Sequence, residues 1–382
     1  MTVSAAPHPF VPRIVAWEVT RRCALACTHC RGAARDIAYA NELTTHECHM
    51  VIDRLAAWGT PMLILTGGEP MSRSDIYDLA AYAVARGLRV VLAPCGHLIT
   101  PDTARQMVDA GIAGISISLD GAHAATHDAF RGVDGAFATA CRAIGLARDV
   151  GLAVQVNTTV ARHNVEELPA VLALAERLGV RTLDLFFLVP TGRGGAVRDL
   201  ALNPIECERV LNWVADTAAH AAIRVKTTCA PQYVRILHQR EKQCVSHAQR
   251  VVNASVSVRG RLPVPASRRD PCSSAGSTRA DATGCMAGKG FLFISHTGML
   301  QPCGFLPVEC GDLRHTCFDV RAAYEASSVL KDLAHTDALR GACGACAFRH
   351  ACGGCRARAF AASGDYRGQD PSCAYAQGAH AS

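Results

Sequence analysis

The feature that most constrains the fold of this chain is an alternation of short apolar runs and longer helical patterns over residues 13–225. The apolar runs predict strands at 13–19, 61–66, 88–93, 114–119, 152–159 and 181–188. Helical spacing follows each run, at 44–58, 74–86, 101–110, 134–150, 164–179 and 204–220. Strands that alternate with helices pair in parallel, because each helix carries the chain back across the sheet. Six units are too few to close an eight-stranded barrel, so we predict an α/β fold with a partial, open (β/α)6 barrel.

Local signals support several of these helices. Thr44 and Glu47 have the spacing of a capping box, and Pro101 and Pro204 fit the first turn of two later helices. In parallel sheets of this kind, the reacting groups gather beyond the carboxyl ends of the strands. Residues that directly follow a predicted strand are therefore the candidates for a functional site.

Charge and hydropathy exclude some function classes. The net charge of +6 comes from 39 basic and 33 acidic residues among 382, without a run of five or six like charges. We therefore expect no nucleic-acid partner, whereas an acidic substrate is compatible with this charge. We also expect no membrane partner and no export, because an apolar stretch of eighteen residues and a signal-peptide pattern are both missing. The expected location is cytoplasmic, where the nineteen cysteines would stay reduced and point to metal or redox chemistry.

Three cysteines follow the first predicted strand, in the order C-x3-C-x2-C at Cys23, Cys27 and Cys30. Three thiolates on a [4Fe–4S] cube leave one iron without a protein ligand, and that iron can bind a small chelating molecule. A zinc site with a distant fourth ligand shows the same spacing. After the second predicted strand comes "LTGGEP", in which glycines permit close backbone approach and Glu69 can accept a hydrogen bond from an ammonium group.

On these residues, the chain over 13–225 resembles the radical SAM enzymes. "CALACTHC" is similar to their cysteine motif, with His29 in place of the usual aromatic residue, and "TGGEP" is similar to their methionine-binding motif. The resemblance implies a [4Fe–4S] cluster on the three cysteines, and S-adenosylmethionine that is reductively cleaved to a 5′-deoxyadenosyl radical. The residues that it implies for S-adenosylmethionine binding are Gly67, Gly68, Glu69, Pro70, Ser118 and Asn157. For the last two, ordinary capping of strand ends is an equal alternative.

A second group of cysteines lies near the C-terminus, too dense for free thiols. It comprises Cys285, Cys303, Cys343, Cys346, Cys352, Cys355 and Cys373. This pattern resembles the SPASM domain, which carries auxiliary [4Fe–4S] clusters, and implies one or two of them here. The resemblance implies one complete set at Cys343, Cys346, Cys352 and Cys373 and a partial set at Cys285, Cys303 and Cys355. The second cluster has an open position or a non-cysteine ligand, has Cys272 as its fourth ligand, or is absent. A zinc ribbon is the alternative for 343–355.

We divide the chain into four parts: an N-terminal extension (1–12), the barrel (13–225), a linker or basic insertion (226–284) and the cysteine-rich domain (285–382). Arginine-rich residues 241–284 form either a linker or a basic lid over an acidic substrate. Among the other cysteines, Cys48, Cys141 and Cys207 are expected core residues, Cys95 is a candidate for either packing or the active site, and Cys310 and Cys317 stay unassigned. Loop histidines that could bind iron or protons, or be ordinary loop residues, are His97, His123 and His127.

Within the superfamily, three stretches are similar to the tetrapyrrole-modifying branch: "RIVAWEVTRRCALACTHCRGAA", "GCMAGKGFLFISHTGMLQPCGFLPVECGDLR" and "CGGCRARAFAASGDYRGQDPSC". This branch includes anaerobic heme synthesis and heme d1 synthesis. It implies an acidic tetrapyrrole substrate whose propionate becomes a vinyl group, an auxiliary cluster as electron acceptor, and an electron donor such as flavodoxin or ferredoxin. Arg193 and Arg198 are candidates for binding the substrate carboxylates.

Two alternatives stay open. One is a SPASM enzyme that modifies a ribosomally made peptide, which the short segment before the first strand disfavours. The other is a non-catalytic iron–sulfur electron carrier, which would need neither "GGEP" nor the β/α units.

Overall fold

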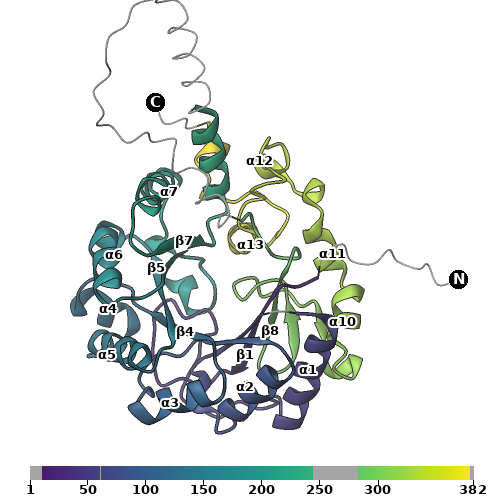
Figure 1. Ribbon diagram of the computed structural model, residues 1–382. Coiled ribbons are helices and arrows are strands. Elements are labelled where there is room, and N and C mark those ends of the chain that lie inside the picture. The colour runs from purple at the N-terminus through teal and green to yellow at the C-terminus, as the bar shows by residue number, and fades with distance from the viewer. Residues whose placement is uncertain (1–10, 61, 244–282, 379–382) are drawn as a thin grey trace, which may run out of the picture.

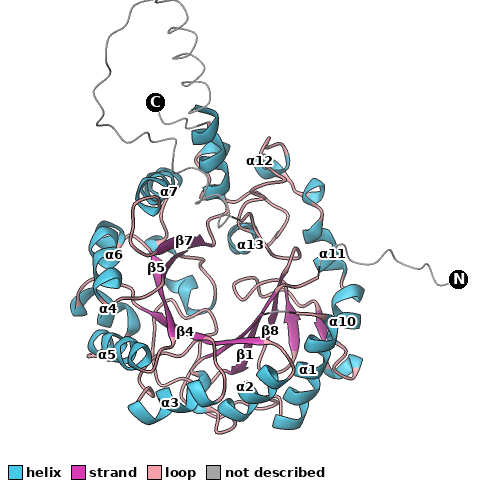
Figure 2. Cartoon of the chain, viewed as in Figure 1, coloured by secondary structure: helices cyan, strands magenta, loops and turns pink. Residues whose placement is uncertain are grey.

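One curved sheet organises the protein. The computed structural model describes residues 11–60, 62–243 and 283–378, and within them the strand order is β10-β9-β8-β1-β2-β3-β4-β5-β6-β7. Strands β1 to β7 pair in parallel, as the β–α alternation predicts. The helices lie outside the arc of the sheet (Figures 1 and 2). The α/β class and the parallel sheet are therefore confirmed.

The barrel strands are β1 (Ile14–Thr20), β2 (Met62–Gly67), β3 (Arg89–Leu92), β4 (Gly114–Ser118), β5 (Ala153–Val160), β6 (Thr182–Phe187) and β7 (Arg224–Thr228). The helices between them are α1 (Thr45–Trp58), α2 (Ile76–Ala85), α3 (Pro101–Asp109), α4 (Ala124–Arg131), α5 (Ala136–Asp149), α6 (Leu168–Arg177) and α7 (Pro204–Ala218). All six predicted strands and six predicted helices are present. The capping box at Thr44 and the first-turn prolines of α3 and α7 are also present.

The C-terminal part adds strands to the other edge of the same sheet. Strand β8 (Phe291–Ile294) pairs in parallel with β1, and β9 (Met299–Gln301) and β10 (Gly311–Asp312) follow in antiparallel order. The helices of this part are α10 (Val320–Ala326), α11 (Ser328–Ala334), α12 (Gly341–Gly344) and α13 (Arg356–Ser363). The guanidinium of Arg358 in α13 donates to the carbonyl oxygen of Cys229, just beyond β7, at 2.9 Å. The C-terminal part thus contacts the sheet near both of its ends (Figure 1).

Two elements differ from the sequence prediction. The short helix α4 was not predicted, and β7 adds a seventh parallel strand to the barrel. The boundary expected at residue 225 falls inside β7, and residues 232–243 are helical rather than a linker. The rest of the expected insertion, including Cys272, lies outside the described residues.

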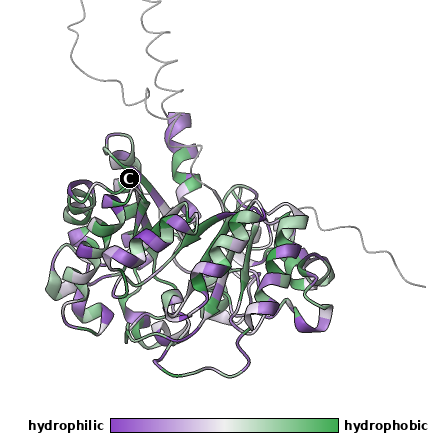
Figure 3. Ribbon diagram, turned by 60° about the horizontal axis from the view of Figure 1, so that its bottom comes forward, coloured by the Kyte–Doolittle hydropathy of each residue, from purple (hydrophilic) through white to green (hydrophobic). Residues whose placement is uncertain are grey.

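Strand alternation separates an apolar face from a polar one. In β1, Val15, Trp17 and Val19 are buried in the main apolar core, and Glu18 lies on the opposite face because successive side chains alternate. Apolar colouring dominates the strands, whereas the helices carry both apolar and polar stretches (Figure 3). None of the helices in the described ranges has the length and apolar character that crossing a membrane requires.

We predict opposite effects from two glycine substitutions. A Cβ on Gly114 in β4 would lie 2.6 Å from the carbonyl oxygen of Ala153 in β5, so Gly114→Ala should destabilise the protein by about 1–3 kcal/mol. A Cβ on Gly145 in α5 meets nothing within 4 Å, so Gly145→Ala should stabilise it by about 0.5–1 kcal/mol. Urea unfolding measures both, and equal effects would contradict the close strand contact.

Candidate functional site

A row of polar side chains crosses the sheet at one level. Ser118 in β4 pairs in register with Asn157 in β5, Asn157 with Asp184 in β6, and Asp184 with Lys226 in β7. The ammonium of Lys226 lies 2.9 Å from the buried carboxylate of Asp184, to which the Thr228 hydroxyl also donates at 2.9 Å. Burial raises the pKa of Asp184, and Lys226 offsets only part of that rise. The structure therefore brings the predicted Ser118 and Asn157 together with an ion pair between buried Asp184 and half-buried Lys226, which the sequence reading missed.

The three N-terminal cysteines lie on the loop after β1, and that loop is held by its backbone. The guanidinium of Arg193 donates to the carbonyl oxygens of Cys27, at 2.8 Å, and Ala34, at 2.5 Å. Cys23 also donates its backbone N–H to Arg35, at 3.0 Å. Arg193, a candidate for binding substrate carboxylates, thus holds the cysteine loop through two of its nitrogens.

Hydrogen bonds divide the cysteines into two chemical types. The thiols of Cys48, Cys207 and Cys310 point at backbone carbonyl oxygens 3.6–3.8 Å away and so act as donors, which requires protonated sulfur. Six others accept a backbone N–H at 3.3–3.4 Å, so these sulfurs face donors. The accepting sulfurs belong to Cys23, Cys30, Cys303, Cys343, Cys346 and Cys352. All six are predicted cluster ligands, so their surroundings fit thiolates that bind iron.

The two glycines of "TGGEP" pack against the segment that leads to Cys23. A Cβ on Gly67 would lie 2.4 Å from the carbonyl oxygen of Thr20, and one on Gly68 would lie 2.5 Å from those of Arg21 and Arg22. These glycines were predicted to let a ligand approach. The structure shows that close backbone packing against the cysteine loop already requires them.

Glu69 is buried and oriented by backbone donors. Its carboxylate accepts from the backbone N–H of Met71, at 2.9 Å, and of Cys95, at 2.8 Å, while burial raises its pKa. Pro70 begins a buried 3-10 turn directly after it. Each carboxylate oxygen has a second lone pair, so Glu69 can still accept from an ammonium group. This arrangement fits the amino group of S-adenosylmethionine.

A buried cation lies beside Cys27. Arg131 in α4 forms an ion pair with Asp120, and its Nη1 lies 3.7 Å from the Cys27 sulfur. Although burial raises the pKa of Asp120, Arg131 brings it down to about 2. His29 stacks on Phe130 with ring centroids 3.9 Å apart, and burial lowers its pKa to about 3. The imidazole is therefore neutral and fills the place of the usual aromatic ring by stacking.

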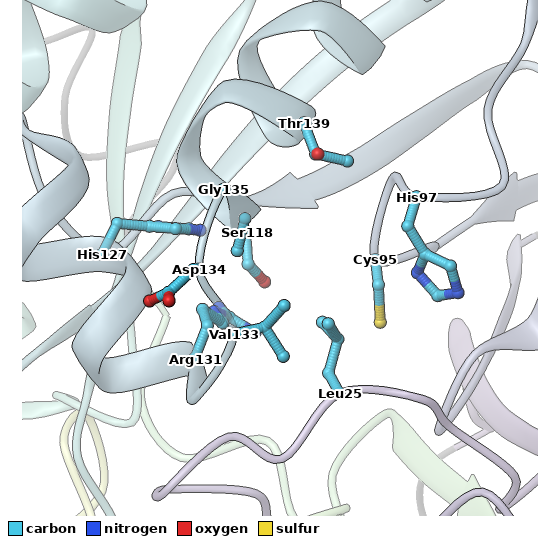
Figure 4. A pocket seen from close by; sticks show the side chains of 11 residues that line it. Leu25, Cys95, His97, Ser118, His127, Arg131, Val133, Asp134, Gly135 and Thr139 are labelled. Atoms are coloured by element: carbon cyan, nitrogen blue, oxygen red, sulfur yellow. The ribbon is translucent and has the colours of Figure 1, made fainter.

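A pocket opens between the cysteine loop and the ends of β3 and β4 (Figure 4). Leu25 comes from the cysteine loop, Cys95 and His97 from the loop after β3, Ser118 from β4, and Arg131 from α4. The Cys95 sulfur is 3.9 Å from that of Cys23 and 3.5 Å from the Gly68 carbonyl oxygen. Cys95 thus lines the site as a protonated thiol, one of the two roles considered for it.

The three candidate histidines have different surroundings. The Nδ1 of His127 accepts the backbone N–H of Asp120 at 2.9 Å, so that nitrogen is engaged. His123 precedes α4 at its N-terminal cap. The Nδ1 of His97 lies 3.7 Å from Glu69, and its side chain lines the pocket.

The C-terminal cysteines divide into two groups. Cys352 lies close to Cys343 and Cys373, and Cys346 follows Cys343 in the same short helical turn region. Gly353 and Gly354 both have left-handed backbones, and a Cβ on Gly354 would lie 2.8 Å from the Cys343 sulfur. These glycines make the short C-x2-C spacing possible, because they turn the chain sharply between Cys352 and Cys355.

Cys355 belongs to the second group, with Cys285 and Cys303. Cys303 lies beside both Cys285 and Cys355, and the thiol of Cys229 interacts with that of Cys355. The neighbouring Cys229 lowers the pKa of Cys355. A zinc ribbon that used all four cysteines of 343–355 does not match this division. Cys229 was missed by the sequence reading, and its place directly after a seventh strand was the signal that could have found it.

The comparisons with known proteins agree with this geometry. A family model described as the radical SAM superfamily matches residues 17–175. The chain is 42% identical to the AdoMet-dependent heme synthase of Nitratidesulfovibrio vulgaris, over 95% of this chain and 92% of that protein. It is 41% identical to the AdoMet-dependent heme synthase of Methanosarcina barkeri, over 96% and 97%. The solved structure of native anSMEcpe with bound AdoMet shares the fold, with a TM-score of 0.64, 14% identity, and coverage of 96% of this chain and 95% of that one.

Replacing Arg131 should expose the cost of a buried unpaired charge. Arg131→Met leaves Asp120 without its cation, and we expect a loss of about 3–5 kcal/mol in the free energy of unfolding at pH 7. Arg105→Met removes an exposed ion pair with Asp102 on α3 and should cost no more than about 1 kcal/mol. Similar losses from both substitutions would contradict a buried role for Arg131.

The same pair predicts a pH dependence. The lowered pKa of Asp120, about 2 against an ordinary 3.8, stabilises the native protein above the ordinary value, and this stabilisation is lost as pH falls through 2. The difference between the wild type and Arg131→Met should therefore narrow between about pH 4 and pH 2. Urea unfolding across this range measures it, and a constant difference would count against the pairing.

Proposed function

We propose that this chain, which belongs to the radical SAM superfamily, acts on an acidic tetrapyrrole and converts a propionate side chain to a vinyl group. It is an enzyme of that superfamily, with a [4Fe–4S] cluster and S-adenosylmethionine as cofactors. The observation that best supports the substrate class is identity above 40% to two heme synthases over almost the whole of each chain. The accepting sulfurs beside a buried glutamate and a pocket support the chemistry.

The ligand assignment of the first cluster is part of the proposal. Cys23, Cys27 and Cys30 would each hold one iron, and the fourth iron would bind S-adenosylmethionine. When bound, these two groups supply a 5′-deoxyadenosyl radical that takes a hydrogen atom from the substrate. The chain would bind S-adenosylmethionine through the "GGEP" turn (Gly67, Gly68, Glu69 and Pro70) and through Ser118 and Asn157.

Residues around the cysteine loop control its charge and access. Arg131 places a buried cation 3.7 Å from the Cys27 sulfur, and this charge offsets part of the burial that raises the pKa of that thiol. Asp120 holds that cation in place, and the rings of His29 and Phe130 stack on one another. Together these side chains would give a preorganised surrounding for the first cluster.

Cations on the polar face of the sheet are suited to substrate carboxylates. Arg31 lies 4.4 Å above the Phe293 ring and pairs with the buried Glu18, while Lys226 pairs with Asp184. Both cations keep part of their side chain exposed. A flat macrocycle rimmed with carboxylates matches cations spaced across the inside of a curved sheet.

To become a vinyl group, the propionate must lose CO2 and one electron in addition to the hydrogen atom. After hydrogen is taken from the β-carbon of the propionate, the Cβ–Cα bond becomes a double bond, and CO2 and one electron leave. Auxiliary [4Fe–4S] clusters would supply an acceptor for that electron. We propose one on Cys343, Cys346, Cys352 and Cys373, and a second to which Cys285, Cys303 and Cys355 contribute.

The proposal also covers the electron donor, the cellular location and the domain organisation. The electron that starts the reaction would come from a donor such as flavodoxin or ferredoxin, and the location would be cytoplasmic. The radical SAM barrel and the auxiliary domain would be functional units, although β8 joins them into one sheet.

Two cysteine substitutions separate the roles of the two regions. Cys23→Ala removes a ligand of the first cluster and should abolish formation of 5′-deoxyadenosine from S-adenosylmethionine under dithionite. Cys343→Ala should lower iron by about four per chain and retain part of that cleavage. Cys141→Ala, on α5, is the control and should match the wild type. Retained cleavage in Cys23→Ala would refute the cluster assignment.

The substrate is tested directly by anaerobic incubation with iron-coproporphyrin III. We expect release of CO2 and a product lighter by the mass lost when a propionate becomes a vinyl group, measured by mass spectrometry. Abundant 5′-deoxyadenosine with intact porphyrin would overturn the tetrapyrrole proposal and return attention to a peptide substrate. A protein that forms no 5′-deoxyadenosine at all would instead behave as an electron carrier.

A further inference from the structure

We propose that Cys229 is the fourth ligand of the second auxiliary cluster, with Cys285, Cys303 and Cys355. This inference rests on the proposed function, which places a second cluster at those three cysteines but leaves its set incomplete. In the sequence pattern, Cys285 is the one cysteine of the motif before Cys303, and Cys272 was the candidate for a fourth ligand. The fold instead brings in a cysteine from the end of the barrel.

The four cysteines lie together at the junction of the barrel and the C-terminal part. The thiols of Cys229 and Cys355 interact, and Cys229 also neighbours Cys303. Cys285 in turn lies beside Cys303 and Cys355. Cys229, Cys285 and Cys303 all pack against one small apolar cluster that contains Cys355. The result is a group of four thiols with an apolar lining, separate from the main core.

The backbone at Cys229 is held in an unusual conformation. Cys229 has φ of 60°, in the left-handed region that a residue with a side chain seldom adopts. Its carbonyl oxygen accepts from Arg358 at 2.9 Å, and Arg358 is itself buried. This conformation directs the chain out of β7 at the point where the side chain meets Cys355. Such local strain persists where the surroundings fix it, and functional sites are where it concentrates.

The sulfur contact of Cys229 differs from those of the core cysteines. Cys48, Cys207 and Cys310 each point their thiol at a carbonyl oxygen close by in the chain. Cys229 instead packs against the small cluster that contains Cys355, a residue more than a hundred positions away. Its side chain therefore lies among the predicted ligands of the second cluster, not against a carbonyl oxygen of its own segment.

A fourth thiolate has a chemical consequence. A cube with four cysteine ligands has no open iron, so the second auxiliary cluster would transfer electrons rather than bind substrate. The ligand also ties the cluster to β7, whose Thr228 donates to Asp184 on the polar face. Strand β7 would then connect the second cluster, through Cys229 directly after it, to the row of polar side chains, through Lys226.

Cys229→Gly is the sharpest test, because glycine accepts the left-handed backbone and removes only the thiol. We expect iron in the anaerobically reconstituted full chain to fall from about twelve per chain to between about eight and eleven. The Mössbauer and electron paramagnetic resonance spectra should change for one auxiliary cluster only. Circular dichroism and thermal unfolding check that the variant is folded.

Three further variants make the result decisive. Cys310→Ala, a buried cysteine of the same part of the chain, should keep full iron, and so should Cys272→Ala. Full iron and unchanged spectra in Cys229→Gly, with iron lost in Cys285→Ala, would overturn the role of Cys229 alone. Full iron in both would show that the second cluster is absent, which overturns that part of the proposed function as well. Loss of iron in Cys272→Ala with full iron in Cys229→Gly would assign the fourth ligand to Cys272 and overturn this inference.

Discussion

The buried ion pair between Arg358 and Asp370 is the interaction on which the two halves of the protein depend. The Asp370 carboxylate accepts the backbone N–H of Cys355 at 2.8 Å, and its own backbone N–H donates to the Cys343 sulfur at 3.3 Å. Arg358 donates to the carbonyl oxygen of Cys229, beyond β7. Both charges are almost fully buried, so removing either one would leave the other uncompensated, at a cost of about 3–5 kcal/mol. One pair therefore connects both groups of C-terminal cysteines to the edge of the barrel.

A second constraint is the supply of backbone N–H groups around sulfur and carboxylate. Cys23, Glu69 and Cys303 each receive hydrogen bonds from nearby backbone amides. These donors are fixed by the fold, so they offset part of the burial that raises the pKa of Glu69 and of Cys303. The core thiols of Cys48, Cys207 and Cys310 instead donate to backbone carbonyl oxygens. Local backbone geometry thus separates the predicted cluster ligands from the packing cysteines more sharply than burial does.

Most strands and helices could be predicted from the sequence, but the contacts between residues far apart in the chain could not. Hydrophobic periodicity and caps located six strands and six helices, because these patterns act over short distances. Strand β7 was missed because it is short and polar at its end, with burial confined to Val225. The spacing motifs identified Cys23, Cys27, Cys30 and "GGEP". Cys229 and Lys226 could not be found this way, because their partners come close only in the folded sheet.

The pairing of β8 with β1 also determines when the molecule can be completed during synthesis. Ile14 pairs with Phe291, so β1 waits for a strand much later in the chain before its outer edge is covered. Until then an apolar parallel strand presents unpaired amides and carbonyls, which favours aggregation. Completion of the sheet therefore follows the synthesis of β8, and the nascent chain depends on protection of β1 in the meantime.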